Sequence, residues 1–166
     1  AGISKAFYAG LRVAFVYAPK QFRNRIAKAI LNTIWMAPTL NAAIVSECIK
    51  DGTADKIISL KIEELSRRFR VIKEKLCKYT FSSSSNSFFV WLNLPEHWTS
   101  KEFELTARMN GVNVFSAEKF AVGGSAAPAA IRLSLSGTET IDELCKGLDI
   151  LQNILSEEYV DLNAIL

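Results

Sequence analysis

Lys5 and Arg12, seven positions apart, are the only charged side chains in the first nineteen residues of the chain. Small and apolar residues surround both. Because an unpaired charge is costly to bury, this segment predicts a partner that is anionic or reactive. A lysine amine is a nucleophile toward an aldehyde, and an arginine guanidinium is a planar fork that suits a phosphate. Together they supply what pyridoxal 5′-phosphate requires of a protein.

The apolar run LRVAFVY (11–17) predicts the strand that positions these two cations. A nearly continuous run of valine and aromatic residues is typical of a parallel strand covered on both faces, as in an α/β sheet, and Pro19 closes it. At the edge of such a strand Lys5 would lose water, which favours the neutral amine. Gly10 would allow a close approach of the backbone.

Helical spacing of apolar residues predicts most of the following elements. One helix runs from Lys20 to about Ala37, where Pro38 breaks the pattern, and a short second helix ends at Lys50. The longest apolar stripe predicts a helix of about 25 residues, roughly 38 Å long. Such a helix is longer than one small domain requires, so we expect it to bridge two domains. The basic cluster 67–70 is interpreted as its solvated face.

Strands alternate with helices in the second half of the chain, after a Ser-rich loop at 81–87. Three segments predict strands: 87–95, 112–116 and 130–136. Thr99 and Glu102 predict a capping box at the start of one helix, and a final amphipathic helix is expected from Thr138 to about Glu158. The pattern is typical of a compact α+β module.

Composition excludes several classes of function. The net charge of +3 is mild, and neither zinc-finger spacing nor an aromatic-basic RNA motif occurs. The three cysteines lie far apart and His97 is the single histidine, so their spacing predicts no metal site, and we expect buried free thiols. No apolar run reaches transmembrane length and no signal peptide opens the chain. We therefore expect a cytoplasmic protein without a membrane partner.

Two longer motifs resemble a known family. SKAFYAGLR (4–12), with the apolar run after it, resembles the Schiff-base segment of class I/II aminotransferases, which are fold type I pyridoxal-phosphate proteins. The lysine–arginine spacing is closest to the aminotransferase-like effector domains of GntR-type transcription regulators, the MocR group. The segment 111–137, which contains SAEKFAV and RLSL, is similar to the small domain of those regulators. The resemblance covers nearly the whole chain.

The resemblance implies an α/β fold, the C-terminal part of a fold type I PLP-dependent transferase. Residues 1–52 would be the C-terminal piece of the large, parallel-sheet PLP-binding domain, residues 53–80 the long interdomain helix and residues 81–166 the small α+β domain. The resemblance also implies a longer protein. In the family, the aspartate that pairs with the pyridinium nitrogen, the aromatic residue that stacks on the ring and the phosphate-binding helix all precede the lysine.

The resemblance also implies roles for single residues. Lys5 would form the Schiff base with the cofactor, Arg12 would bind the cofactor phosphate, and Arg132 would bind the α-carboxylate of an amino acid. Ser4 and Tyr8 are further candidate cofactor-binding residues. The family usually has serine or threonine three residues before the lysine, where this chain has glycine, and the Tyr8 hydroxyl could replace it. Packing is the alternative role for Tyr8, and a surface ion pair is the alternative for Arg132.

Two functions of different class fit these residues. In the first, the chain is the effector domain of a GntR/MocR-type regulator, in which amino-acid binding changes the DNA contacts of an upstream domain. In the alternative, it belongs to a working aminotransferase that moves an amino group from an amino acid to a 2-oxo acid. An inactive scaffold that keeps only the fold is a third reading. The family pattern implies a homodimer, and the 166-residue piece alone is expected to be inactive.

Overall fold

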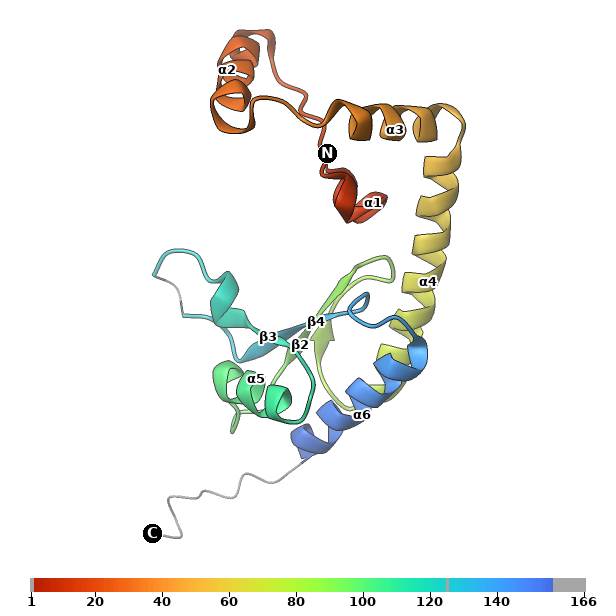
Figure 1. Ribbon diagram of the computed structural model, residues 1–166. Helices are drawn as coiled ribbons and strands as arrows, with labels where there is room; N and C mark the ends of the chain where they lie inside the picture. Colours follow the sequence, from red (N-terminus) through yellow and green to blue (C-terminus); the bar gives the residue numbers. More distant parts are fainter. Residues whose placement is uncertain (1, 125, 157–166) are drawn as a thin grey trace. The chain divides into compact units, whose positions relative to one another are not determined.

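The computed structural model describes residues 2–124 and 126–156, and it divides into two compact units between Ile62 and Glu63. The first unit is built from helices, and the long helix α4 begins in it and continues into the second (Figure 1). The elements that start in the first unit are α1 (Ile3–Ala6), the 3₁₀ helices η1 (Ala9–Leu11) and η2 (Lys20–Phe22), α2 (Arg23–Ile34), α3 (Thr39–Lys50) and α4 (Thr53–Lys75).

The strand predicted at residues 11–17 is wrong. Ala14 forms only an isolated antiparallel bridge with Gly2, Val13 is the one buried residue of the run, and Tyr17 is 97% exposed. A buried parallel strand needs a ladder of backbone hydrogen bonds to a neighbour and a covering layer on each face. The described residues supply neither, so this apolar run does not form a strand.

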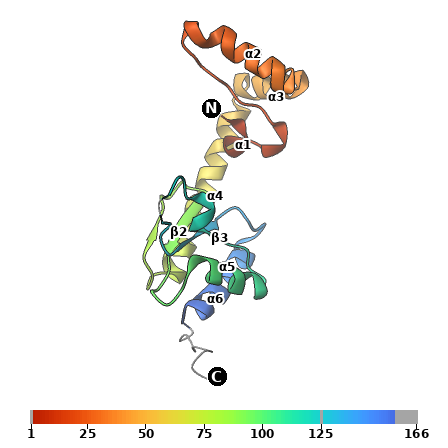
Figure 2. The ribbon, with the colours of Figure 1, turned by 90° about the vertical axis from the view of Figure 1, so that its left-hand side faces the viewer.

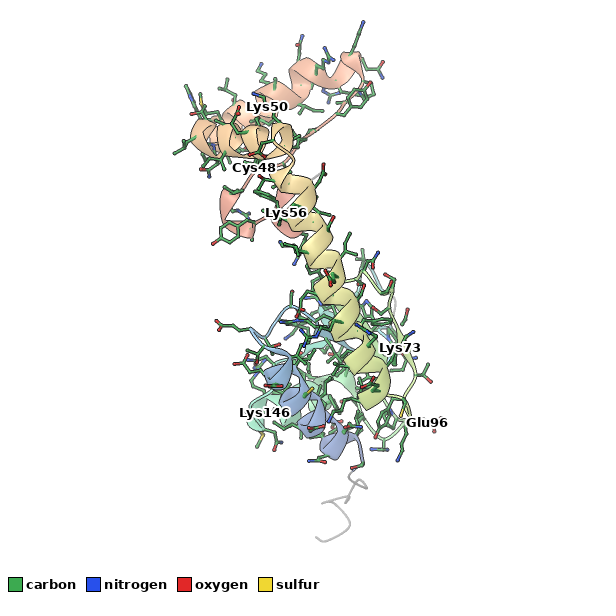
Figure 3. All side chains as sticks on the ribbon, turned by 90° about the vertical axis from the view of Figure 1, so that its right-hand side faces the viewer. Cys48, Lys50, Lys56, Lys73, Glu96 and Lys146 are labelled. Carbon is green, nitrogen blue, oxygen red and sulfur yellow. The ribbon has the colours of Figure 1, made fainter. Side chains whose placement is uncertain are left out.

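The helices predicted up to residue 80 are confirmed, with shorter boundaries. The first begins with a turn of 3₁₀ helix and ends at Ile34, before Pro38, which is the N-cap of α3. Half-buried Cys48 lies on α3 (Figure 3). The Asp51 carboxylate accepts a hydrogen bond from the N–H of Thr53 at 2.9 Å. That bond caps the start of α4 and lowers the pKa of Asp51.

A four-stranded sheet organises the second unit (Figure 1). Its strands are β1 (Phe81–Ser82), β2 (Phe89–Asn93), β3 (Phe115–Ser116) and β4 (Ala130–Ser134). The order is β1-β2-β4-β3, and every neighbouring pair is antiparallel. Two of the predicted strands are thus confirmed, and the one at 112–116 forms only over its last two residues. The Ser-rich stretch at 81–87 was expected to be loop throughout, but its first two residues pair with β2.

One face of the sheet is covered by α5 (Ser100–Met109), α6 (Ile141–Ser156) and the second half of α4. Figures 1 and 2 show α5 and α6 side by side below the strands. The capping box predicted for α5 is present, with Thr99 and Glu102 bonded to each other's backbone N–H. Alternate strand residues face this core: Val90 and Leu92 from β2, Ile131 and Leu133 from β4.

Arg68 corrects the interpretation of the basic cluster 67–70 as a solvated helix face. Its guanidinium is buried and bonds to Glu64 through Nε at 2.7 Å. It also donates, at 2.8–2.9 Å, to three carbonyls of the loop before α6, those of Leu135, Thr138 and Glu139. Arg68 therefore ties α4 to the start of α6, while the other arginines of the cluster are exposed, as predicted.

Candidate functional site

Four of the five predicted site residues lie in one short segment of the first unit. Ser4 and Lys5 are on α1, Tyr8 is the N-cap of η1 and Arg12 is its C-cap. Ser4 is half-buried and the other three are exposed. The fifth residue, Arg132, lies on β4 in the second unit. One segment thus carries an amine, a guanidinium and two hydroxyls.

Neighbouring helices hold the backbone of this segment. Asn41 of α3 donates a hydrogen bond from its Nδ2 to the carbonyl of Leu11 at 2.9 Å. Lys61, in the first part of α4, donates from its Nζ to the carbonyl of Lys5 at 3.4 Å and to that of Phe7. The polar contacts therefore fix the main chain from which the candidate side chains extend.

The turn at η1 has two unusual backbone features. Arg12 has φ 52°, in the left-handed region that few residues other than glycine adopt. A Cβ placed on Gly10 would lie 2.6 Å from the Tyr8 ring. Gly10 therefore allows the Tyr8 ring to lie against the backbone.

The surroundings of Lys5 differ from the sequence-based expectation. Lys5 was expected at the edge of a buried strand, where loss of water would favour its neutral amine. The strand does not form, and Lys5 is exposed on α1. The described residues do not provide the expected desolvation.

Aromatic rings surround the guanidinium of Arg132. Its Cζ lies over the ring of Phe120 at 4.2 Å from the centroid, over Phe89 at 4.3 Å and over Phe115 at 5.3 Å. Phe89 comes from β2, and Phe115 and Phe120 come from β3 and the 3₁₀ helix η3 (Ala117–Phe120) that follows it. Because β2 and β3 flank β4, the rings reach Arg132 from both sides of its strand.

Arg132 lies on the sheet face opposite the core. It is in register with Trp91 on β2 and with Phe115 on β3, so these three side chains share a face. The Nε of Arg132 is buried and has no hydrogen-bond partner among the described residues. A guanidinium with parallel N–H donors suits a carboxylate, and the surface ion pair considered as its alternative role is not found within residues 2–124 and 126–156.

A buried carboxylate anchors the segment that carries Phe120. Glu104 on α5 accepts hydrogen bonds from Lys119, from the N–H of Ser116 at 2.9 Å and from Arg108 at 2.8 Å. Burial by itself raises the pKa of Glu104, but the hydrogen bonds from Lys119 and Ser116 outweigh it and lower the pKa to about 2. This cluster holds η3 beside β3, which places Phe120 over Arg132.

Sequence reasoning missed the aromatic residues around Arg132 and the role of Glu104. The alternation of Phe89 and Trp91 on a predicted strand was a signal that both rings share one face. No signal in the sequence pairs Glu104 with Lys119, because helix and loop meet only in the folded unit. The roles predicted for Ser4, Lys5, Tyr8, Arg12 and Arg132 stay predictions.

Neither a metal site nor a membrane-spanning helix occurs among the described residues. Within residues 2–124 and 126–156, no group of three or more His, Cys, Asp or Glu side chains could hold a metal ion. In the same residues, no helix is both long and apolar enough to cross a membrane. Cys48 and Cys145 are free and half-buried, whereas Cys77 is exposed, so the expectation of a buried thiol is wrong there.

Two sequence comparisons relate the chain to known proteins. The family model of class I and II aminotransferases matches residues 1–148. The uncharacterized HTH-type transcriptional regulator YdeF of Bacillus subtilis (strain 168) is 33% identical over 157 residues. That alignment covers 95% of this chain and 34% of the regulator, so the chain spans about a third of this curated relative's length.

Solved structures of aminotransferases share the fold. An archaeal alanine:glyoxylate aminotransferase matches 95% of this chain and 40% of its own, with 22% identity and a TM-score of 0.82. The aromatic aminotransferase of Pyrococcus horikoshii OT3 matches 93% of this chain and 41% of its own, also with 22% identity and a TM-score of 0.82. At this identity the likeness shows the fold alone.

These matches confirm the predicted fold class. The chain is α/β and has the fold of part of a fold type I transferase, a fold whose members generally use pyridoxal 5′-phosphate. The family model extends from the segment of Lys5 and Arg12 through the strand of Arg132, so it includes every predicted site residue. The chain belongs to the class I and II aminotransferase family.

Proposed function

We propose that this chain is the aminotransferase-like effector part of a GntR/MocR-type transcription regulator. It holds pyridoxal 5′-phosphate through Lys5 and Arg12 and binds an amino acid through Arg132. The parent protein is a cytoplasmic homodimer that contacts DNA through another domain. The division into residues 1–52, 53–80 and 81–166 as large-domain piece, interdomain helix and small domain is part of the same proposal.

The observation that carries the proposal is the composition of the α1–η1 segment. It presents the Lys5 amine and the Arg12 guanidinium, both exposed, on a backbone that α3 and α4 hold by hydrogen bonds. An amine for an aldehyde and a guanidinium for a phosphate are the donors that pyridoxal 5′-phosphate takes. The residues present therefore fit the cofactor.

Each residue has a separate task in this proposal. The cofactor, when bound, supplies an aldehyde and an electron sink. Lys5 would hold the cofactor through its Nζ, the amine that pairs with the aldehyde. Arg12 donates to the phosphate oxygens, with Ser4 and Tyr8 as hydroxyl donors beside it. Arg132 donates two parallel N–H groups to the carboxylate of the amino acid.

A regulator is preferred to an enzyme because of the curated relative. YdeF, 33% identical over nearly the whole chain, is named as an HTH-type transcriptional regulator. The alternative, a working class I/II aminotransferase, is supported by solved aminotransferases, which share the fold at 22% identity. A regulator changes its operator affinity when amino acid is added and turns over little 2-oxo acid. An aminotransferase turns over the 2-oxo acid at an enzymatic rate, and adding amino acid changes no operator affinity.

The role of Lys5 is tested by trapping. The full-length protein is loaded with pyridoxal 5′-phosphate and reduced with borohydride, and the modified peptide is identified by mass spectrometry. We expect the pyridoxyl group on Lys5 and loss of the imine absorbance in Lys5→Ala. Lys20→Ala is the matched control, because Lys20 is another exposed lysine of the first unit. A pyridoxyl group on a different lysine would overturn the proposal.

A further inference from the structure

We propose that the rings of Phe89 and Phe120 form a slot around Arg132 that selects a planar carboxylate over a tetrahedral anion of equal charge. This inference rests on the proposed role of Arg132 in carboxylate binding and adds a selectivity to it. Phe89, Phe120 and the guanidinium between them are called the arginine slot below. Phe89 and Phe120 are positioning residues, because they act through Arg132.

The geometry points to a ring on each of two sides of the guanidinium. The Cζ of Arg132 lies almost equally far from the two ring centroids, 4.3 Å from Phe89 and 4.2 Å from Phe120. One ring comes from the β2 side of β4 and the other from the β3 side. With a ring on each side, we infer that the guanidinium meets a ligand by its edge, where the N–H donors are.

An unmatched donor marks this edge as a binding position. The Nε of Arg132 is buried without a hydrogen-bond partner among the described residues. A buried donor left unpaired costs free energy, and a bidentate carboxylate would accept from it. Such a carboxylate lies in the plane of the guanidinium, so both of its oxygens stay between the ring walls.

A tetrahedral anion does not fit between those walls in the same way. Both oxygens of a phosphinate can lie in the guanidinium plane, but the two other substituents of its phosphorus then point out of that plane, toward the rings. The single substituent of a carboxylate carbon stays in the plane. The two rings, centred 4.3 and 4.2 Å from Cζ, crowd substituents that leave this plane. The negative face of an aromatic ring also repels the third oxygen of a phosphonate. The rings therefore lower the affinity for a phosphinate or phosphonate more than for a carboxylate.

The wall formed by Phe120 is itself supported. The Trp91 ring meets it edge to face, with centroids 5.2 Å apart and an interplanar angle of 86°. The neighbouring Lys119 is paired with buried Glu104. Because contacts on two sides hold Phe120, it resists moving away to admit a wider ligand.

The test compares two anions that differ in shape but not in charge. The probes are the L-amino acid that binds most tightly in a screen of the twenty common ones and its 1-aminoalkylphosphinate analogue, a monoanion that is tetrahedral at phosphorus. Their Kd values are measured by calorimetry on the full-length, cofactor-loaded protein. The readout is the ratio of the two values, which a general loss of stability does not change.

We expect the wild-type protein to prefer the carboxylate, and Phe120→Ala and Phe89→Ala to reduce that preference by roughly threefold to tenfold, the scale of a cation–π contact. Phe120→Tyr keeps a ring and should therefore keep the wild-type preference for the carboxylate. If Phe120→Ala does not fold, Phe120→Leu is used in its place. Phe81→Leu is the control, because the Phe81 side chain packs against the core on the other sheet face. It should leave the ratio unchanged.

Arg132→Gln separates this inference from the function on which it rests. If Arg132→Gln weakens carboxylate binding but the ring variants keep the wild-type ratio, the slot is wrong and the proposed role of Arg132 stands. If Arg132→Gln leaves carboxylate binding unchanged, or no amino acid binds the wild-type protein, the proposed role of Arg132 is wrong. The selectivity inferred for the arginine slot is then wrong as well.

Discussion

At the scale of single residues, Glu104 shows how one carboxylate can position a binding residue that it does not touch. It pairs with Lys119 and accepts from the N–H of Ser116, at the two ends of the turn that leads to Phe120. Phe120 in turn lies over Arg132. A substitution of Glu104 should therefore loosen the backbone of residues 115–120 before other segments.

Glu104→Gln keeps the shape of the side chain and removes its charge. We expect it to weaken the anchoring of residues 115–120 by about 1–3 kcal/mol at pH 7, the cost of losing a hydrogen bond to a charged group. Hydrogen–deuterium exchange of peptides that cover this segment measures the effect as faster exchange. Glu96→Gln is the control, because Glu96 is an exposed carboxylate (Figure 3).

The same interaction should depend on pH. The pKa of Glu104 is lowered in the fold from 4.5 to about 2, so its contribution to stability is fully present above pH 4.5. It is lost progressively as the pH falls from there through about 2. The exchange difference between wild type and Glu104→Gln, corrected for intrinsic rates, should shrink over this window. A difference that stays constant from pH 7 to pH 2 would contradict the assignment.

At the scale of elements, Arg68 joins two helices that are far apart in the sequence. Arg68→Leu leaves three carbonyls of the 135–139 loop without their donor, while Glu64 stays partly solvated. We expect a loss of about 2–4 kcal/mol in local stability, seen as faster hydrogen exchange over residues 135–144. Arg70→Leu, on the exposed side of the same helix, should cost less than about 0.5 kcal/mol. Equal effects of the two variants would contradict the role of Arg68.

Helices of this chain could be predicted from the sequence because their signals are local. The spacing of Leu65, Phe69 and Ile72 fixes the buried face of α4, and the capping box fixes the start of α5. Strands depend on partners. The run at 11–17 has the residues of a buried strand but only one bridge, whereas the short β1 forms because β2 lies beside it.

The candidate site, too, could be predicted only where its signals are local in the sequence. Lys5, Arg12 and Arg132 could be proposed from motifs, because a motif is contiguous in the sequence. The arginine slot could not, since it needs the register of β2 with β4 and the placement of η3. The burial of Arg68 could not be predicted either, because its acceptors lie about seventy residues away in the sequence.

At the scale of the whole molecule, the first unit leaves many apolar side chains uncovered. Among them are Tyr17, 97% exposed, and Trp35, 69% exposed, together with Ile34 and Met36. Apolar patches of this kind are found on surfaces that associate with other chains or segments. We expect the 166-residue chain alone to self-associate, which size-exclusion chromatography over a range of concentrations would show.

We expect that the 166-residue chain alone neither transaminates nor binds pyridoxal 5′-phosphate tightly. The cofactor becomes an electron sink when a carboxylate keeps its ring nitrogen protonated. By resemblance to the family, that carboxylate, the stacking aromatic and the phosphate-binding helix precede Lys5. The chain spans only about a third of the regulator that it matches.

A cofactor titration and a transamination assay, run in parallel on this chain and on the full-length protein, measure the difference. A faint imine absorbance would decide nothing, because exposed lysines also form imines in solution. Turnover by the isolated chain at about 1 per second or more, a rate typical of enzymes, would show that its residues alone complete the active site.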